Sequence, residues 1–342
     1  MSATPIASAL AAAALFGAST PAAKALVGEM HPVLLAGLLY AGSGAGLTIW
    51  FLISRKTPGL RRADIRWLAA AVLAGGIAGP VLLMVGLATT GAATTSLLLN
   101  LEGVFTALLA WFVFGENFDR RIALGMALIV CGGVLLALEP GVFQQAHLGA
   151  LAVAGACLAW AIDNNFTRKI SGGDATAIAA IKGVVAGVAN LAIAALAGAQ
   201  WPGLAPSLSA AAVGFLGYGV SLVLFVVALR GLGAARTGAY FSTAPFVGVA
   251  VAIAVLGESP GLLFWPAAAL MLAGLWLHLS ERHEHPHMHE PTEHEHSHAH
   301  DAHHQHEHAF EWDGREPHVH PHRHRRLKHS HPHYPDIHHR HH

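Results

Sequence analysis

The sequence predicts an all-α integral membrane protein, in which ten transmembrane helices form two inverted five-helix repeats and a disordered, His-rich cytoplasmic tail follows. The first observation is composition, because 54% of the 342 residues are hydrophobic and only 12% are charged. Globular proteins carry roughly 25% charged residues, so this apolar surplus needs a hydrocarbon solvent. The second observation is a series of apolar runs of spanning length, and the third is a segment that recurs 142 residues later.

Ten apolar runs, separated by short polar breaks, are long enough to cross a bilayer as helices. About 20 apolar residues span a hydrocarbon core of about 30 Å. No Lys or Arg precedes the first run, so it is predicted to be a helix and not a cleaved signal peptide. The short breaks leave no room for a soluble enzyme domain before residue 280. The runs cover residues 6–27, 32–53, 67–87, 92–114, 121–138, 148–168, 177–198, 208–229, 237–256 and 261–279.

Basic residues between the predicted helices all fall on one side of the membrane. They lie in the breaks after the second, fourth, sixth and eighth helices, and the breaks on the other side contain no Lys or Arg. Because cytoplasmic loops are enriched in Lys and Arg, both termini are predicted to be cytoplasmic. The expected location is the plasma or inner membrane of the cell. The eleven residues are Arg55, Lys56, Arg61, Arg62, Arg66, Arg120, Arg121, Arg168, Lys169, Arg230 and Arg236.

The chain repeats itself at about half the length of its apolar part. The segment GVFTALLAWFVFGE (103–116) is matched by PFVGVAVAIAVLGE (245–258). Five helices are an odd number, so the second half enters the bilayer inverted. This predicts three units: a first repeat at 1–140, a second at 141–280, and the tail at 281–342. Inverted repeats are typical of secondary transporters, although a duplicated helical body without transport is the alternative.

Four marks resemble one known family. They are FGASTPAAKAL (16–26) in the first helix, LAWAIDNNFTRK (158–169) in the sixth, the two Gly-Glu helix ends, and Pro245. Their order resembles the EamA family of the drug/metabolite transporter superfamily over residues 5–280. The resemblance implies a transporter with both termini inside and leaves the solute open. Two features depart from the family pattern: Glu102-Gly103 stands where a proline-centred break is common, and the His-rich tail is additional.

Glu102 is the sharpest candidate for a substrate or coupling site. It lies about ten residues into the predicted helix 92–114, or about 15 Å into a span of about 30 Å. A carboxylate at this depth costs several kcal/mol, on the order of 3, unless it is paired, hydrated or protonated. The sequence predicts proton or cation coupling, or contact with a cationic substrate. The alternative is a structural Glu that bonds between helices.

Five further side chains are candidates for the same site. Asp163 and Asn164 belong to a polar triplet on the predicted helix 148–168, where helix–helix hydrogen bonding is the alternative role. Lys24 and Lys182 lie within predicted helices, where each could pair with an acid, bind an anionic group or extend to the interface. Tyr240 could wall a pocket, although aromatic side chains more often serve packing.

The tail carries 23 of the 26 histidines. Alternating His-x-His with prolines offers no apolar face, so disorder is predicted. Neutral imidazole suits Zn, Ni and Co, so the tail is a candidate site for these metals, while the body is predicted to need no cofactor. Two H-E-x-x-H matches are discounted because Pro286 opposes the helix that the motif requires. The predicted metal ligands are His283, His285, His287, His289, His294, His296, His298 and His300.

The function predicted from these features is secondary transport of a small metabolite by alternating access, with export the favoured direction. The partners are the lipid bilayer, the solute and divalent metals; a homodimer is left open, and no basic nucleic-acid module is present. The sequence contains no Walker loop, which argues against ATP-driven pumping. It offers no nucleophile–base pair and no intramembrane His cluster, so it is not predicted to be an enzyme. Two alternatives remain: a divalent metal transporter fed by the tail, and a non-transporting membrane sensor or buffer of metal.

Overall fold

The structure is a computed structural model whose chain forms two compact units, Met1–Ser280 and Glu281–His342. We call the first unit the body and the second the tail. The body is described at residues 3–54, 59–113, 120–138, 146–170, 174–232, 237 and 240–279. The tail is described at residues 283–289, 293–298, 318–323 and 327–333.

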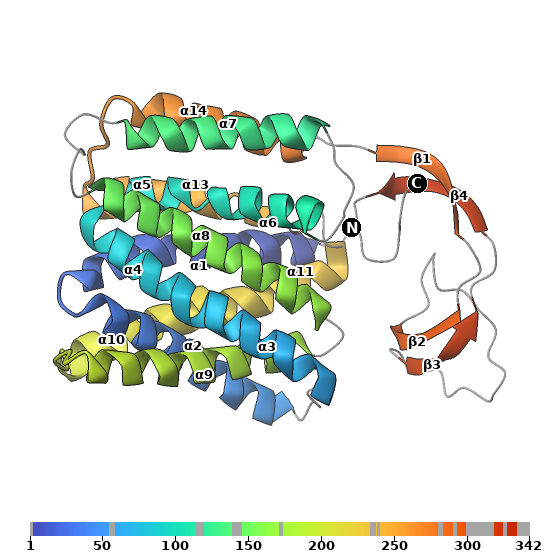
Figure 1. Ribbon diagram of the computed structural model, residues 1–342, viewed down its shortest axis with the longest axis horizontal. Coiled ribbons are helices and arrows are strands. Elements are labelled where there is room, and N and C mark those ends of the chain that lie inside the picture. The colour runs from blue at the N-terminus through green and yellow to red at the C-terminus, as the bar shows by residue number, and fades with distance from the viewer. Residues whose placement is uncertain are drawn as a thin grey trace. The chain divides into compact units, whose positions relative to one another are not determined.

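The described part of the body is helical throughout (Figure 1). In its first half the elements are α1 (Ala3–Val27), α2 (Pro32–Ser54), η1 (Arg62–Asp64), α3 (Ile65–Ala71), η2 (Val72–Ala78), α4 (Gly79–Thr89), α5 (Ala92–Leu98), α6 (Leu101–Phe112) and α7 (Arg120–Ala137). In its second half they are α8 (Ala146–Lys169), α9 (Ala175–Leu196), α10 (Leu204–Gly214), η3 (Phe215–Val220), α11 (Ser221–Leu232), α13 (Ala244–Leu256) and α14 (Phe264–Leu279).

Seven helical stretches in the described residues are long and apolar enough to cross a membrane, and α13 and part of α14 are shorter apolar helices. Many large apolar side chains point outward; Phe112, for example, is 79% exposed and Leu196 is 90% exposed. Contiguous apolar surface of this kind marks contact with lipid or a partner. The prediction of an all-α membrane body is therefore confirmed.

Three predicted helices have internal irregularities. The predicted helix 92–114 is broken at Leu99–Asn100, between α5 and α6, so Glu102 lies in the first turn of a new helix. The predicted helices 67–87 and 208–229 each contain a π-helical segment, η2 and η3. A π-helical turn accommodates one extra residue and shifts the backbone carbonyls, and such turns are frequent at functional sites.

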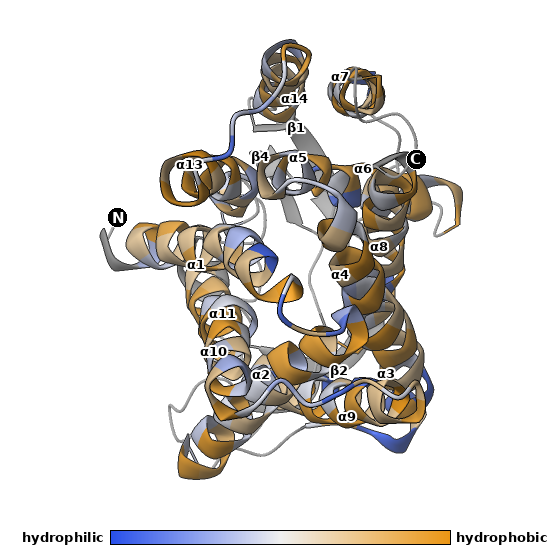
Figure 2. Ribbon diagram, turned by 90° about the vertical axis from the view of Figure 1, so that its left-hand side faces the viewer, coloured by the Kyte–Doolittle hydropathy of each residue, from blue (hydrophilic) through white to orange (hydrophobic). Residues whose placement is uncertain are grey.

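The helices of the body pack in a set of related pairs. α1 packs on α11 and α13, while α8 packs on α4 and α6; α2 packs on α9 and on α10. Seen along the helices, α7 and α14 lie together outside the ring that the others form (Figure 2). The α2–α9 contact depends on small residues, because a methyl group on Gly183 would come within 2.6 Å of the Gly44 Cα. Small residues at such crossings let the backbones approach closely.

The tail corrects the prediction of disorder. Four strands form two antiparallel pairs, β1 (His283–His289) with β4 (Leu327–His333) and β2 (Glu293–His298) with β3 (His318–Arg323). Alternating His-x-His has the two-residue period of a strand, a signal that composition alone does not register. Proline is tolerated because both strands of a two-stranded sheet are edges, and such isolated pairs are marginally stable in water.

Candidate functional site

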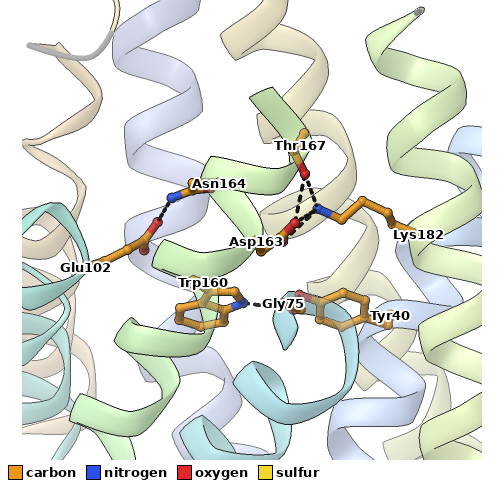
Figure 3. Close-up of polar contacts among 8 residues, drawn as sticks. All are labelled: Tyr40, Gly75, Glu102, Trp160, Asp163, Asn164, Thr167 and Lys182. Carbon is orange, nitrogen blue, oxygen red and sulfur yellow. Dashed lines mark hydrogen bonds and ion pairs between the residues drawn. The ribbon is translucent and has the colours of Figure 1, made fainter. Parts of the chain in front are cut away.

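Glu102 and Asn164 meet across the two halves of the body. The Asn164 side chain, from the C-terminal part of α8, donates a hydrogen bond of 2.8 Å to the Glu102 carboxylate on α6 (Figure 3). Asn164 is exposed and Glu102 is half-buried. Among the described residues, this neutral amide is the hydrogen-bond partner of the Glu102 side chain. Two of the predicted site residues are therefore in direct contact.

Asp163 and Lys182 form an ion pair beside this contact. The Lys182 ammonium, on α9, lies 2.5 and 2.6 Å from the two Asp163 carboxylate oxygens (Figure 3). Thr167, one turn further along α8, donates to the same carboxylate at 2.8 Å and accepts from Lys182 at 3.2 Å. The Lys182 and Asp163 side chains are only 17% and 9% exposed. Of the three roles predicted for Lys182, the structure therefore shows pairing with a buried acid.

The polar triplet on α8 divides its side chains among different neighbours, as the 100° step of a helix requires. Asp163 and Asn165 are buried, whereas Asn164 between them is exposed. Asn165 donates to the backbone carbonyls of Ala161 at 2.9 Å and Thr106 at 3.4 Å. Asn165 therefore has a structural role, and Asp163 and Asn164 supply the polar groups that contact α9 and α6.

The Gly75 carbonyl, in the π-helix η2, accepts two hydrogen bonds. Tyr40 on α2 donates at 2.9 Å and Trp160 on α8 donates at 3.0 Å (Figure 3). Because Trp160 precedes Asn164 by four residues, the two side chains lie one above the other on one face of α8. The π-helix thus joins Tyr40 to Trp160, and Trp160 lies one turn of α8 from Asn164. Neither Gly75 nor Tyr40 was among the site residues predicted from the sequence.

Replacing Gly75 by Ala is expected to lower stability by about 1–3 kcal/mol, the usual cost of overpacking. A methyl group there would overlap the Asp163 carboxylate and come within 2.5 Å of its Cβ, so rotation of the carboxylate cannot relieve the clash. The matched control is Gly103→Ala on α6, where no atom lies within 4 Å of the added methyl. Thermal unfolding of both variants in one detergent measures the difference; equal midpoints would contradict the expectation.

Lys24 and Glu258 hold the link between α4 and α5 from two sides. Lys24 on α1 donates to the carbonyls of Leu87 at 2.7 Å and Thr90 at 2.9 Å, where the carbonyl end of the α4 dipole favours a cation. The Glu258 carboxylate accepts from the backbone amides of Ala92 at 2.7 Å and Ala93 at 2.8 Å. We call these four hydrogen bonds the clasp. Lys24 is therefore placed in the clasp and not beside Glu102.

Glu258 reaches α5 because α13 ends two residues earlier, at Leu256. Gly257 takes a φ of 66°, the left-handed conformation that commonly closes a helix, and the Glu258 amide bonds back to the Ala252 carbonyl at 3.3 Å. Sequence reasoning placed Glu258 at a helix end without an inter-half role. The sequence feature that could have indicated this role is the Gly-Glu pair, which occurs at 115–116 and again 142 residues later at 257–258. Glu116, the counterpart of Glu258 in the first half, lies outside the described residues.

The remaining predicted site residues are not brought to the Glu102 contact. Tyr240 is half-buried. Its backbone carbonyl accepts hydrogen bonds from the backbone amide and the hydroxyl of Thr243. Seven of the predicted metal ligands lie on β1 and β2, and His300 lies outside the described residues. Within the part of the chain that the structure describes, no group of three or more His, Cys, Asp or Glu side chains could hold a metal ion.

The model of the EamA-like transporter family matches this chain twice, over residues 3–138 and 147–280. The chain belongs to this family. A curated relative is an uncharacterized transporter of Methanothermobacter thermautotrophicus (strain Delta H), 28% identical over 290 residues that cover 78% of this chain and 84% of the relative. A solved protein crystal structure covers 79% of this chain and 95% of its own at a TM-score of 0.60; at 19% identity it shows likeness of fold alone.

Membership of the EamA-like transporter family confirms the resemblance on which the sequence analysis relied. It makes the chain a multi-pass membrane protein related to transporters, and its partners are then the lipid bilayer and a small-molecule substrate. The site built from α6, α8 and α9 lies within the two matched ranges, whereas the tail lies beyond both.

Proposed function

We propose that this family member is a secondary transporter that moves a small metabolite by alternating access. The carrying observation is the Glu102–Asn164 contact with the Asp163–Lys182 pair beside it, because it joins ionisable groups from both halves of an apolar body. Ionisable residues inside membrane helices mark substrate or ion pathways. In transporters with inverted repeats, the solute binds between the repeats near the middle of the bilayer.

Ten spanning helices in two inverted halves, residues 1–140 and 141–280, form the framework of this proposal. The double match of the family model supports two halves. The packing supports them too, since exchanging the halves converts the α1–α11 and α1–α13 contacts into the α8–α4 and α8–α6 contacts. The π-helices η2 and η3 occupy equivalent places, and Gly75 and Gly217 within them are 142 residues apart.

The clasp supports alternating access, because it joins the halves at one end of the bundle. Glu258 follows α13 in the second half, and the amides that it accepts from belong to α5 in the first half. A rocking motion that opens this end must separate Glu258 from Ala92 and Ala93. The loss of two charge-assisted hydrogen bonds, each worth about 1.5–3 kcal/mol, favours the closed arrangement of this end when no solute is bound.

The test is efflux from proteoliposomes that contain the purified full chain and a defined mixture of solutes. The mixture holds amino acids, amines and quaternary amines, organic acids, nucleosides and divalent metal ions, and mass spectrometry follows each solute. Saturable, protein-dependent efflux of any metabolite supports the proposal. Flux restricted to divalent metals would favour the alternative of a metal transporter. The absence of any protein-dependent flux would favour the alternative of a non-transporting membrane sensor or buffer of metal.

We propose that both termini are cytoplasmic and that the chain resides in the cell membrane with export as its direction. The supporting observation is the one-sided placement of eleven basic residues between the predicted helices. A reporter that is active only in the cytoplasm, fused after His342, is expected to be active. Activity of an externally active reporter at the same position would reverse the proposed orientation.

We propose that the tail binds Zn, Ni or Co through its histidines, separately from transport. Truncation after Ser280 removes 23 of the 26 histidines, so calorimetry at pH 7.5 should detect several metal sites in the full chain and none in the truncated one. Binding should fall steeply from pH 7 to pH 5.5, because protons compete for imidazoles with a reference pKa of about 6.5. Equal binding by both chains would exclude the tail as the metal site.

A further inference from the structure

The charges of the Glu102 site do not balance within the described residues. Two carboxylates, Glu102 and Asp163, face one ammonium, Lys182, which contacts both oxygens of Asp163. Glu102 is left with a neutral amide. The site therefore carries a net charge of −1 when all three groups are ionised. A carboxylate inside an apolar body is costly without a positive partner, so the solute or a proton must supply that charge.

Aromatic rings extend through both halves of the body, starting one helical turn along α8 from Asn164. They begin at Trp160 and Tyr40, which are joined through the Gly75 carbonyl, and continue by direct ring contacts. Apart from the buried Trp160, each of these rings is half-buried. We call this set the aromatic band. Its ring-centroid distances are 5.7 Å for Tyr40–Tyr218, 5.8 Å for Phe16–Tyr218, 5.4 Å for Phe16–Phe241 and 4.9 Å for Phe225–Phe241.

The hydrogen-bond donors at the start of the aromatic band are already used. The Tyr40 hydroxyl and the Trp160 indole N–H both donate to Gly75, so these side chains offer ring faces and not free donors. A ring face carries a negative quadrupole and attracts cations. The band is therefore suited to an apolar or cationic body, whereas a polyhydroxylated solute or an anion would find few donors there.

We propose that the substrate is a monovalent organic cation, whose charged nitrogen is held by Glu102 and whose apolar part lies against the aromatic band. The inference rests on the proposed transport function and names the substrate class of the same site. A divalent metal ion fits less well, because it takes four or more N, O or S ligands. Among the described residues, no group of three or more His, Cys, Asp or Glu side chains could hold a metal ion.

The experiment measures binding of radiolabelled phenyltrimethylammonium to the purified full chain in lipid nanodiscs. Excess unlabelled compound should displace it, whereas excess tert-butylbenzene, the neutral isostere, or benzoate should not. Glu102→Gln should weaken binding at least 10-fold, and Tyr218→Leu should weaken it about 2- to 13-fold, the range for the loss of one aromatic ring contact with the apolar part of the ligand. The control is Phe112→Leu, which removes a ring that is 79% exposed on the same helix as Glu102 and should leave binding unchanged.

The inference would be overturned if the neutral isostere displaced the ligand as effectively as the cation does, or if Glu102→Gln left the affinity unchanged. Absence of cation binding to the folded wild-type chain would overturn it as well, and Glu102 would then carry only a proton. The efflux experiment separates this failure from failure of the transport proposal. If a neutral or anionic metabolite leaves the proteoliposomes, transport stands and the organic-cation class is wrong.

Discussion

Replacing Lys182 by Met is expected to destabilise the protein by about 3–5 kcal/mol, the cost of leaving a buried charge without its partner. The Asp163 carboxylate is 9% exposed and receives two short contacts from the Lys182 ammonium. Thr167 alone would remain as a donor to it. Unfolding by SDS titration in mixed micelles, with wild type beside the variant, measures the loss.

The double variant Asp163→Asn/Lys182→Met is the decisive control, because it removes both charges together. Replacement of a whole buried ion pair by neutral groups is often close to neutral, so most of the lost stability should return. The side-chain amide introduced at position 163 could still accept a hydrogen bond from Thr167. Wild-type stability of Lys182→Met alone would show that the pair is hydrated. A double variant as unstable as the single one would show that charge balance is not what the pair supplies.

The positions of helices could be predicted from sequence, whereas the pairing within the site could not. Runs of about 20 apolar residues indicate where the chain is helical in a membrane, whatever the neighbouring helices do. Asp163 and Lys182 lie on different helices, α8 and α9, and their contact depends on how these helices cross. The sequence identified both residues as unusual for apolar helices, which is why both were candidates before the structure placed them together.

Backbone irregularities were invisible to hydropathy for a related reason. The break between α5 and α6 falls at Leu99 and Asn100, and neither residue is a proline or a glycine. The π-helix η2 lies within an unbroken apolar run, and its consequence, a Gly75 carbonyl with two side-chain donors, arises only when α2 and α8 pack beside it. A hydropathy average reports the composition of a whole window of residues, whereas these irregularities depend on single backbone hydrogen bonds.

Replacing Glu102 by Gln is expected to lower the initial transport rate about 10- to 100-fold, the range for losing one interaction with a charged group. The substitution keeps the volume, and the Gln carbonyl can still accept the hydrogen bond from Asn164 that Glu102 now accepts. Insertion and folding should therefore be preserved, so a loss of transport reports the missing charge. The measurement is solute flux in proteoliposomes between pH 6 and pH 8.5, with the solute identified by the efflux experiment.

The matched control is Glu29→Gln, which makes the same chemical change at an exposed residue just after α1 and should leave the flux and its pH dependence unchanged. If Glu102 exchanges a proton for the solute, the residual flux of Glu102→Gln should no longer respond to pH, since no titrating group remains at the site. If it recognises a cationic solute, the apparent affinity should fall more than the maximal rate. Wild-type flux with an unchanged pH profile would make Glu102 a structural partner of Asn164 and would move the search for the coupling group to Asp163 and Lys182.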